Sequence, residues 1–261
     1  MKIPIYQVDA FTDKLFGGNP AAVCPLEEWL PGTMMQAIAE ENNLSETAFF
    51  VRKEDADAFE LRWFTPKIEI FLAGHPTLAV AHVIYEHLKY SGPQISFHTK
   101  SGELRIKKRN GLILMDFPGF DPAPSEPPEA LVKGLRKEPR ETLKGRDFFA
   151  VFDSEAEVLD LRPDFAELEK LDCLGIIVTA KGDTCDFVSR FFAPRAGILE
   201  DPVTGSAHTL LIPFWAKRLN KNVLHAYQVS KRRGEIFCEY LGKRVQIGGR
   251  AVTYMTGMIE V

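Results

Sequence analysis

Two short segments of this chain place a glycine and a polar residue at the start of an apolar stretch: Gly74-His75 and Gly205-Ser206. Both stretches are expected to form buried helices. The first N–H groups of a helix lack partners within it and carry the positive end of its dipole, so they attract anions. We therefore expect the two helix starts to bind a carboxylate substrate together, in a cleft between two lobes. The alternative for each glycine is turn geometry alone, with Ser206 as a plain N-cap.

Two acidic residues are candidates for moving a proton. Glu46 stands between an expected helix end and the apolar strand 48–51. A carboxyl group shielded from water there can alternately accept and donate a proton, as general acid-base chemistry requires. Asp201 comes just before the second glycine segment, although Asp-Pro is also a common turn. A water-exposed Glu46 at a strand edge remains the alternative.

The histidines divide into candidates and residues expected to be structural. His75 is either an imidazole of the site or a core histidine whose hydrogen bonds are satisfied. His208, inside the second helix, stands between the candidates and the structural histidines. The other four are expected on helix faces or strands without a chemical role: His82, His87, His98 and His225.

An internal repeat indicates how these residues are positioned. The pattern Arg-aromatic-Phe-small-Pro-basic begins at Arg62 and returns at Arg190, 128 residues later. Each copy is followed by a glutamate (Glu69, Glu200) and, five positions on, by the glycine of the helix start. Two blocks in the same order at half the chain length indicate duplication into two lobes. A proline-rich linker over 117–128 separates the expected lobes, residues 1–118 and 128–261.

Hydrophobic patterning predicts the same scheme in both halves. In the first half we expect an amphipathic helix around Met35 and Ile38, a buried helix over 77–88, and strands over 3–11, 21–24, 47–51, 59–64, 94–98, 103–108 and 112–117. In the second half we expect a buried helix over 208–215 and strands over 148–151, 175–180, 187–192, 226–230, 235–240 and 244–247. The predicted fold is α+β, with two pseudo-symmetric lobes, each a curved, mostly antiparallel sheet wrapped around a central helix.

Composition narrows the classes of partner. The chain has 261 residues and a formal charge of -4, which provides no basic field for nucleic acid. No apolar stretch is long enough for a membrane span, and the N-terminus lacks the features of a secretory signal, so a cytoplasmic location is expected.

Cofactor and metal sites are not expected either. The four cysteines form no CxxC pair, and the histidines are scattered, which argues against disulfides and zinc. No Gly-x-Gly-x-x-Gly fingerprint for a nicotinamide or flavin dinucleotide is present. Most lysines lie in charged runs, unlike the Schiff-base lysine of a pyridoxal enzyme.

Six motifs together resemble the phenazine biosynthesis PhzF-like isomerase family: Asp9-Ala10-Phe11-Thr12, Gly18-Asn19-Pro20-Ala21-Ala22-Val23, Asn43-Leu44-Ser45-Glu46-Thr47-Ala48-Phe49, Phe64-Thr65-Pro66, Gly74-His75-Pro76-Thr77 and Glu200-Asp201-Pro202-Val203-Thr204-Gly205-Ser206-Ala207. The resemblance implies a diaminopimelate epimerase-like fold, often as a homodimer. It implies Glu46 as the acid-base residue of a cofactor-free proton shift, assisted by His75, Asp201 and Ser206. It also implies substrate binding by the backbone at Gly74-His75 and Gly205-Ser206, with Asn19 among the binding residues.

A comparison with related racemases refines the expected reaction. Proline racemases and the related epimerases use two cysteine thiols, one before the glycine of each helix start, and these positions are Ala73 and Thr204 here. A two-thiol racemase is therefore excluded, and a single carboxylate suits a suprafacial isomerisation. One loop is more basic than the resemblance to close relatives implies: Ser230-Lys231-Arg232-Arg233-Gly234-Glu235. Whether this loop contacts the substrate is therefore left open. A non-catalytic binding or regulatory protein using the same cleft is the alternative.

Overall fold

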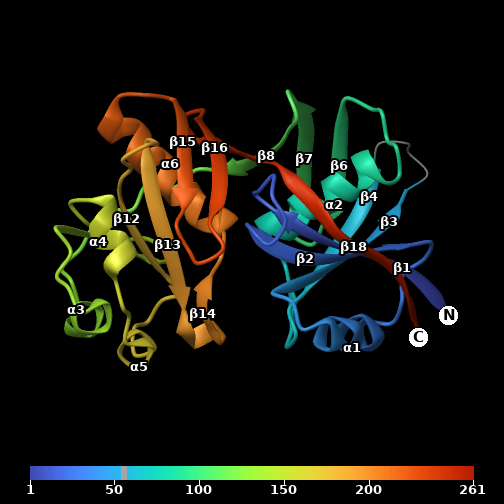
Figure 1. Ribbon diagram of the computed structural model, residues 1–261, viewed down its shortest axis with the longest axis horizontal. Coiled ribbons are helices and arrows are strands. Elements are labelled where there is room, and N and C mark those ends of the chain that lie inside the picture. The colour runs from blue at the N-terminus through green and yellow to red at the C-terminus, as the bar shows by residue number, and fades with distance from the viewer. Residues whose placement is uncertain (54–57) are drawn as a thin grey trace. The chain divides into compact units, whose positions relative to one another are not determined.

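The computed structural model describes residues 1–53 and 58–261 and consists of two compact units (Figure 1). Unit 1 contains residues 1–116 and 248–261, and unit 2 contains residues 117–247. These limits differ from the expected lobes, because the last strand returns to unit 1 and the proline-rich segment 117–128 belongs to unit 2.

Unit 1 is one mixed sheet with two main helices. In spatial order its strands are β18 (Ala251–Glu260), β1 (Lys2–Ala10), β2 (Asn19–Leu26), β3 (Glu46–Arg52), β4 (Ala58–Phe64), β6 (Gln94–Thr99), β7 (Gly102–Arg109) and β8 (Leu112–Pro118), with the short β5 (Glu69–Ile70) also beside β4. Most neighbouring strands are antiparallel; β2–β3 and β4–β6 are parallel. The parallel pairs are joined by α1 (Gly32–Asn42) and α2 (Gly74–Glu86), as crossover connections require.

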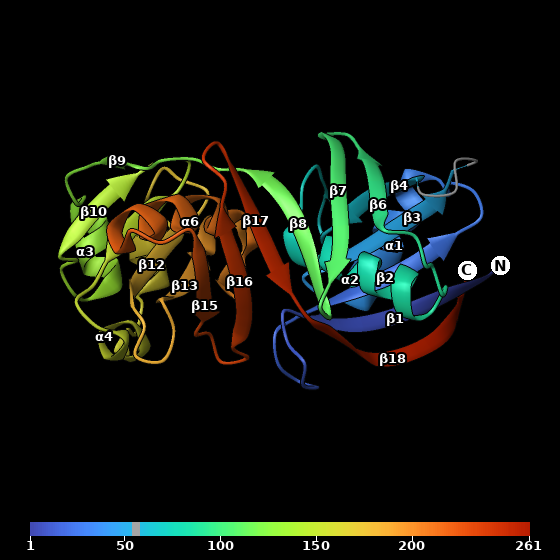
Figure 2. The ribbon, with the colours of Figure 1, turned by 90° about the horizontal axis from the view of Figure 1, so that it is seen from above.

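The two helices of unit 1 differ in burial. α1 buries one side, Met35, Ile38 and Ala39, against a cluster that includes Ile3 and Phe49. α2 is buried over almost its whole length, which confirms the expectation of a central apolar helix. Figure 2 shows β18 running beside β1 at the edge of this sheet.

Unit 2 repeats the arrangement. Its strands are β9 (Ala123–Pro124), β10 (Glu141–Lys144), β11 (Phe148–Val151), β12 (Ile176–Lys181), β13 (Phe187–Ala193), β14 (Ile198–Asp201), β15 (Val223–Gln228), β16 (Gly234–Tyr240) and β17 (Arg244–Gly249). The pairs β11–β12 and β13–β15 are parallel, as β2–β3 and β4–β6 are in unit 1. Its helices are α3 (Glu129–Leu135), α4 (Glu155–Asp160), α5 (Phe165–Leu168), the 3₁₀ turn η1 (Pro194–Ala196) and the central α6 (Gly205–Leu219).

Successive side chains along the unit 2 strands point to opposite faces of the sheet, and each face packs against different helices. Phe148, Val178 and Val188 point to the face covered by α3, α4 and α5. Their neighbours Phe149, Thr179 and Phe187 meet α6 on the other face, where Trp215 donates to Thr179 and stacks on Phe187. The α+β class and the two similar units are as the sequence predicts. The described residues contain no helix with the length and apolar character of a membrane span.

Candidate active site

Glu46 and His75 form a buried pair in unit 1. Nε2 of His75 lies 2.9 Å from Oε2 of Glu46, and the two side chains are only 6% and 12% exposed. The distance is that of an ion pair, although the angles fall outside those of a well-formed hydrogen bond. A carboxyl group and an imidazole in contact, largely removed from water, are the ordinary components of general acid-base chemistry.

The amide of Asn19 lies on the other side of the imidazole. Its Nδ2 is 3.1 Å from Nδ1 of His75, and Asn19 is fully buried. Because an amide nitrogen can only donate, Nδ1 accepts, and the ring hydrogen of neutral His75 is on Nε2, toward Glu46. Asn19 thereby sets the tautomer that faces the carboxylate.

Local backbone geometry brings these residues to one end of the sheet. Gly18 has φ +57°, and a Cβ there would lie 2.0 Å from the carbonyl oxygen of Ala10, so only glycine fits the turn before Asn19. Asn43 ends α1 in the left-handed conformation and donates its N–H to Ala39. The chain then enters β3, where Glu46 lies beside Ala21 of β2, two residues after Asn19.

Both central helices begin without a capping side chain. Gly74 and Gly205 are the first helical residues, their N-caps are Ala73 and Thr204, and neither makes a side-chain cap hydrogen bond. Ser206 is therefore the second residue of α6 and not its N-cap, which corrects the alternative considered from the sequence. Helix starts of this kind offer their N–H groups to an anion.

In unit 2 the carboxylate of Asp201 is held by Thr204. The Thr204 hydroxyl donates to Oδ2 of Asp201 at 2.6 Å, and Nε2 of Gln228 donates to Oγ1 of the same threonine at 3.1 Å. Ser206, two residues after Thr204, accepts a hydrogen bond at its backbone carbonyl from the hydroxyl of Thr209. Sequence reasoning missed Gln228, which has no neighbouring motif and reaches the site through the parallel pairing of β13 and β15.

The structure therefore brings the predicted site residues together in two groups. Glu46, His75 and Asn19 lie together in unit 1, with Gly74 at the start of α2. Asp201, Gly205 and Ser206 lie at the end of β14 and the start of α6 in unit 2. The expectation that both groups act on one substrate stays a prediction.

The repeated arginines form matching ion pairs. Nε and Nη2 of Arg62 donate to the two carboxylate oxygens of Glu69 at 2.7 and 2.9 Å, and Arg190 binds Glu200 in the same way at 2.7 and 3.0 Å. Arg62 and then Lys100 hold the pKa of Glu69 down at about 2. Each pair fastens the strand that precedes a central helix, which explains why the motif occurs twice.

Other polar candidates have structural surroundings. Nδ1 of His208 donates to the carbonyl of Thr204, and burial lowers the pKa of its ring to about 4. His82 and His87 both contact the hydroxyl of Thr253, and His225 pairs with Glu235. Burial raises the pKa of the Cys24 thiol to about 12 and raises that of Cys238 as well. Among the described residues no group of three or more His, Cys, Asp or Glu is arranged to hold a metal ion.

The basic loop is packed against the segment before α6. The Ser230 hydroxyl donates to the carbonyl of Pro202, and a Cβ on Gly234 would lie 2.2 Å from Val203. The guanidinium of Arg233 lies 4.1 Å from the ring centre of Tyr227. These contacts give the loop a role in supporting residues 201–204.

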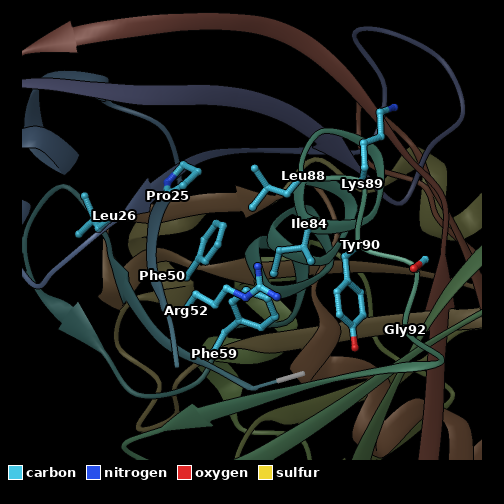
Figure 3. A pocket seen from close by; sticks show the side chains of 11 residues that line it. Pro25, Leu26, Phe50, Arg52, Phe59, Ile84, Leu88, Lys89, Tyr90 and Gly92 are labelled. Carbon is cyan, nitrogen blue, oxygen red and sulfur yellow. The ribbon is translucent and has the colours of Figure 1, made fainter. Parts of the chain in front are cut away.

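Unit 1 also contains a cavity of about 480 Å³ (Figure 3). Phe50, Phe59 and Ile84 form apolar walls, and Arg52 reaches between them. None of the predicted site residues lines this cavity, so it is separate from the Glu46–His75 pair.

Comparison with solved structures defines the class of fold. A hydroxyproline epimerase from Agrobacterium vitis, solved with bound trans-4-hydroxy-L-proline, matches with a TM-score of 0.62 over 99% of this chain and 92% of that chain. At 12% identity this likeness shows the fold alone. The protein therefore has an epimerase-like α+β fold.

Closer relatives define the family. Residues 8–257 match the phenazine biosynthesis-like protein family, PhzC-PhzF. A protein named an uncharacterized isomerase in Pseudomonas aeruginosa is 49% identical over the full length of both chains. The crystal structure of a PhzF family protein from Enterococcus faecalis matches with a TM-score of 0.97 and 46% identity, again over all of both chains. This chain belongs to the phenazine biosynthesis-like, PhzC-PhzF, family.

Proposed function

We propose that the protein is an isomerase that catalyses a cofactor-independent proton shift on a small carboxylated substrate. The observation that carries the proposal is the buried contact between Glu46 and His75, with Asn19 behind the imidazole. The isomerase names of curated relatives agree with this assignment.

Glu46 serves as the proton shuttle in this proposal. Its carboxylate removes a proton from one carbon of the substrate and returns it to another on the same face. His75 contributes the Nε2–H that steadies the carboxylate between the two transfers. One acid-base group is enough for this reaction because the proton never has to cross to the opposite face of the substrate.

The substrate carboxylate is assigned to the helix starts. The N–H groups of the first turn of α2, beside His75, provide donors and the positive end of the helix dipole. The start of α6, with Ser206 and Asp201 nearby in sequence, is proposed to contribute to binding and proton transfer as the family resemblance implies. Soaking carboxylates into crystals would test this assignment, with contacts of about 3 Å to the amides of Gly74-His75 or Gly205-Ser206 as the expected result.

The decisive experiment is the exchange of a carbon-bound proton in D₂O. A panel of unsaturated cyclic carboxylates is incubated with the protein in EDTA and without added cofactor, and exchange is followed by NMR. Glu46→Gln keeps the shape of the side chain but removes the exchangeable acid. On the substrate found in the panel, we expect turnover to fall roughly 10²- to 10⁴-fold while substrate binding persists.

Glu60→Gln is the matched control. Glu60 accepts a hydrogen bond from Trp29 and lies opposite Val51, five residues along β3 from Glu46. This variant should keep full turnover. Near-full activity in Glu46→Gln would refute the proposed mechanism, and carboxylate binding without exchange anywhere in the panel would favour the non-catalytic binding protein instead.

A cytoplasmic location, expected from the sequence, and a homodimeric assembly, implied by the family resemblance, are further parts of the proposal. Light scattering of the purified protein tests the assembly, with the mass of two chains expected.

A further inference from the structure

Gln228, at the end of β15, is fully buried and uses both ends of its amide on the segment before α6. Its Oε1 accepts the backbone N–H of Thr204 at 2.9 Å. Its Nε2 donates to the backbone carbonyl of Asp201 at 2.7 Å and to the hydroxyl oxygen of Thr204 at 3.1 Å.

These partners fix the direction of every hydrogen bond in the network. A backbone N–H can only donate and a backbone carbonyl can only accept, so the amide of Gln228 has one possible orientation. The hydroxyl oxygen of Thr204 receives Nε2–H, and its own hydrogen is directed to Oδ2 of Asp201. The distance of 2.6 Å is that of a hydroxyl donating to a carboxylate.

The surrounding backbone holds the network in place. Gln228 lies opposite Ser189 in the parallel pairing of β13 and β15, and Asp201 lies opposite Phe191 of β13. The bidentate pair of Arg190 with Glu200 fixes the residue next to Asp201. Thr204 is only 6% exposed, so water does not compete for its hydroxyl.

We propose that Thr204 and Gln228 are positioning residues that hold the Asp201 carboxylate as a hydrogen-bond acceptor in one orientation. Thr204 stands at the position of a cysteine thiol in the related racemases. In this protein its hydroxyl orients the neighbouring carboxylate of Asp201. Gln228 acts through Thr204. The part of this inference that concerns turnover rests on the proposed function, in which Asp201 takes part in the proton shift.

Two substitutions at Thr204 separate the hydroxyl from the packing. Thr204→Ser keeps the donor, whereas Thr204→Val keeps the shape and removes it. On the confirmed substrate we expect the serine variant to stay within about 3-fold of the wild-type kcat, and the valine variant to lose about 10- to 100-fold with little change in KM. If the valine variant does not fold, Thr204→Ala replaces it. Equal turnover in the serine and valine variants, with the Asp201 carboxylate in the same orientation in both, would overturn the positioning role.

Gln228→Glu reverses the polarity of the network. The new oxygen in place of Nε2 draws the threonine hydrogen away from Asp201, so kcat should fall about as far as in Thr204→Val. Because Gln228 acts through Thr204, adding Gln228→Glu to Thr204→Val should reduce kcat by less than about 3-fold more. Independent, multiplying losses in the double variant would show that Gln228 acts through its bond to the backbone carbonyl of Asp201 and not through the threonine.

Crystal structures of the three variants give a readout independent of turnover. The Asp201 side chain should keep its orientation in Thr204→Ser and turn in Thr204→Val and Gln228→Glu. An unmoved carboxylate in Thr204→Val would refute the inference whatever the activity. A turned carboxylate with full turnover would instead uphold the network and remove Asp201 from the proposed reaction.

Discussion

Glu46 is the first residue of β3 and Asp201 is the last residue of β14, and their partners suit the two carboxylates to different tasks. Glu46 faces an imidazole, a side chain that can itself take up or release a proton, whereas a hydroxyl cannot do so in this pH range. Asp201 faces a hydroxyl that the structure fixes as a donor, so its carboxylate is held as an acceptor. A proton shuttle is therefore better placed on Glu46 than on Asp201.

Asn19→Leu should disturb the imidazole without touching the carboxylate. The loss of the amide donor leaves Nδ1 of His75 without its hydrogen bond to Asn19, and the Nδ1–H tautomer becomes accessible. We expect turnover to fall about 10- to 100-fold, as for residues that orient a functional histidine elsewhere. Nitrogen NMR of His75 should show a protonated Nε2 in the wild type and a mixture of tautomers in the variant. An unchanged spectrum would contradict the role assigned to Asn19.

His208 should make stability depend on pH. Burial lowers the pKa of its ring from 6.5 to about 4. Between these values the unfolded chain binds a proton that the folded protein does not, so the free energy of unfolding falls as pH falls from 6.5 to 4. The full effect is about 3 kcal/mol, from about 1.4 kcal/mol per pKa unit. His82, whose pKa is also lowered to about 4 by burial, acts in the same direction.

Urea unfolding at several pH values measures this effect. His208→Leu should give a shallower loss of stability between pH 6.5 and 4 than the wild type. His98→Leu, which replaces an exposed histidine on β6, should leave the slope unchanged. A slope in His208→Leu as steep as that of the wild type would show that the buried ring does not cause it.

At the scale of elements, the repeated arginine pairs fasten the strands that precede both central helices. The sequence predicts the repeat, both buried helices and nearly all of the long strands, because their apolar patterns are strong. It does not predict α3, α4 and α5, which have four to seven residues and little periodicity. It also misses Gln228, since the contact depends on which strands are paired and not on a local pattern.

Arg62→Lys and Arg190→Lys should each lower stability by about 1 kcal/mol. Lysine keeps the charge but cannot form two parallel hydrogen bonds to one carboxylate. The two pairs lie in different units, so the losses in the double variant should add. Arg105→Lys, in an exposed pair with Glu103, should cost little by comparison. Thermal unfolding measures all four variants, and equal effects at Arg62 and Arg105 would contradict the importance of the bidentate geometry.

At the scale of the whole molecule, the chain closes unit 1 with its own C-terminal strand. β18 pairs with β1 from Lys2 opposite Glu260 to Ala10 opposite Ala251. Sequence analysis did not predict this strand, because residues 251–260 lack a regular alternation of apolar and polar residues and most of their side chains are exposed or half-buried. The sequence repeat predicts a second lobe over residues 128–261. In the structure residues 248–261, which include β18, belong to unit 1 instead.

This closure predicts how fragments of the chain behave. Residues 117–247 contain the whole of unit 2 and should fold alone, with a cooperative thermal transition. Residues 1–116 lack β18, which leaves β1 as an edge strand paired only with β2, and Ile3 and Ile5 lose the neighbouring Ile259. This fragment should aggregate or remain unfolded.

A rearranged fragment tests the explanation directly. Residue 261 lies next to residue 1, since the N–H of Val261 donates to the carbonyl of Met1. A chain that begins with residues 248–261, continues through a flexible linker of about six residues and ends with residues 1–116 therefore contains all of unit 1. We expect it to unfold cooperatively and to bind carboxylates at the start of α2 if that assignment is correct. A folded 1–116 fragment would show that β18 is not needed to complete unit 1. A rearranged chain no more stable than the 1–116 fragment would show the same, and the pairing of β1 with β18 would then serve a purpose other than stability.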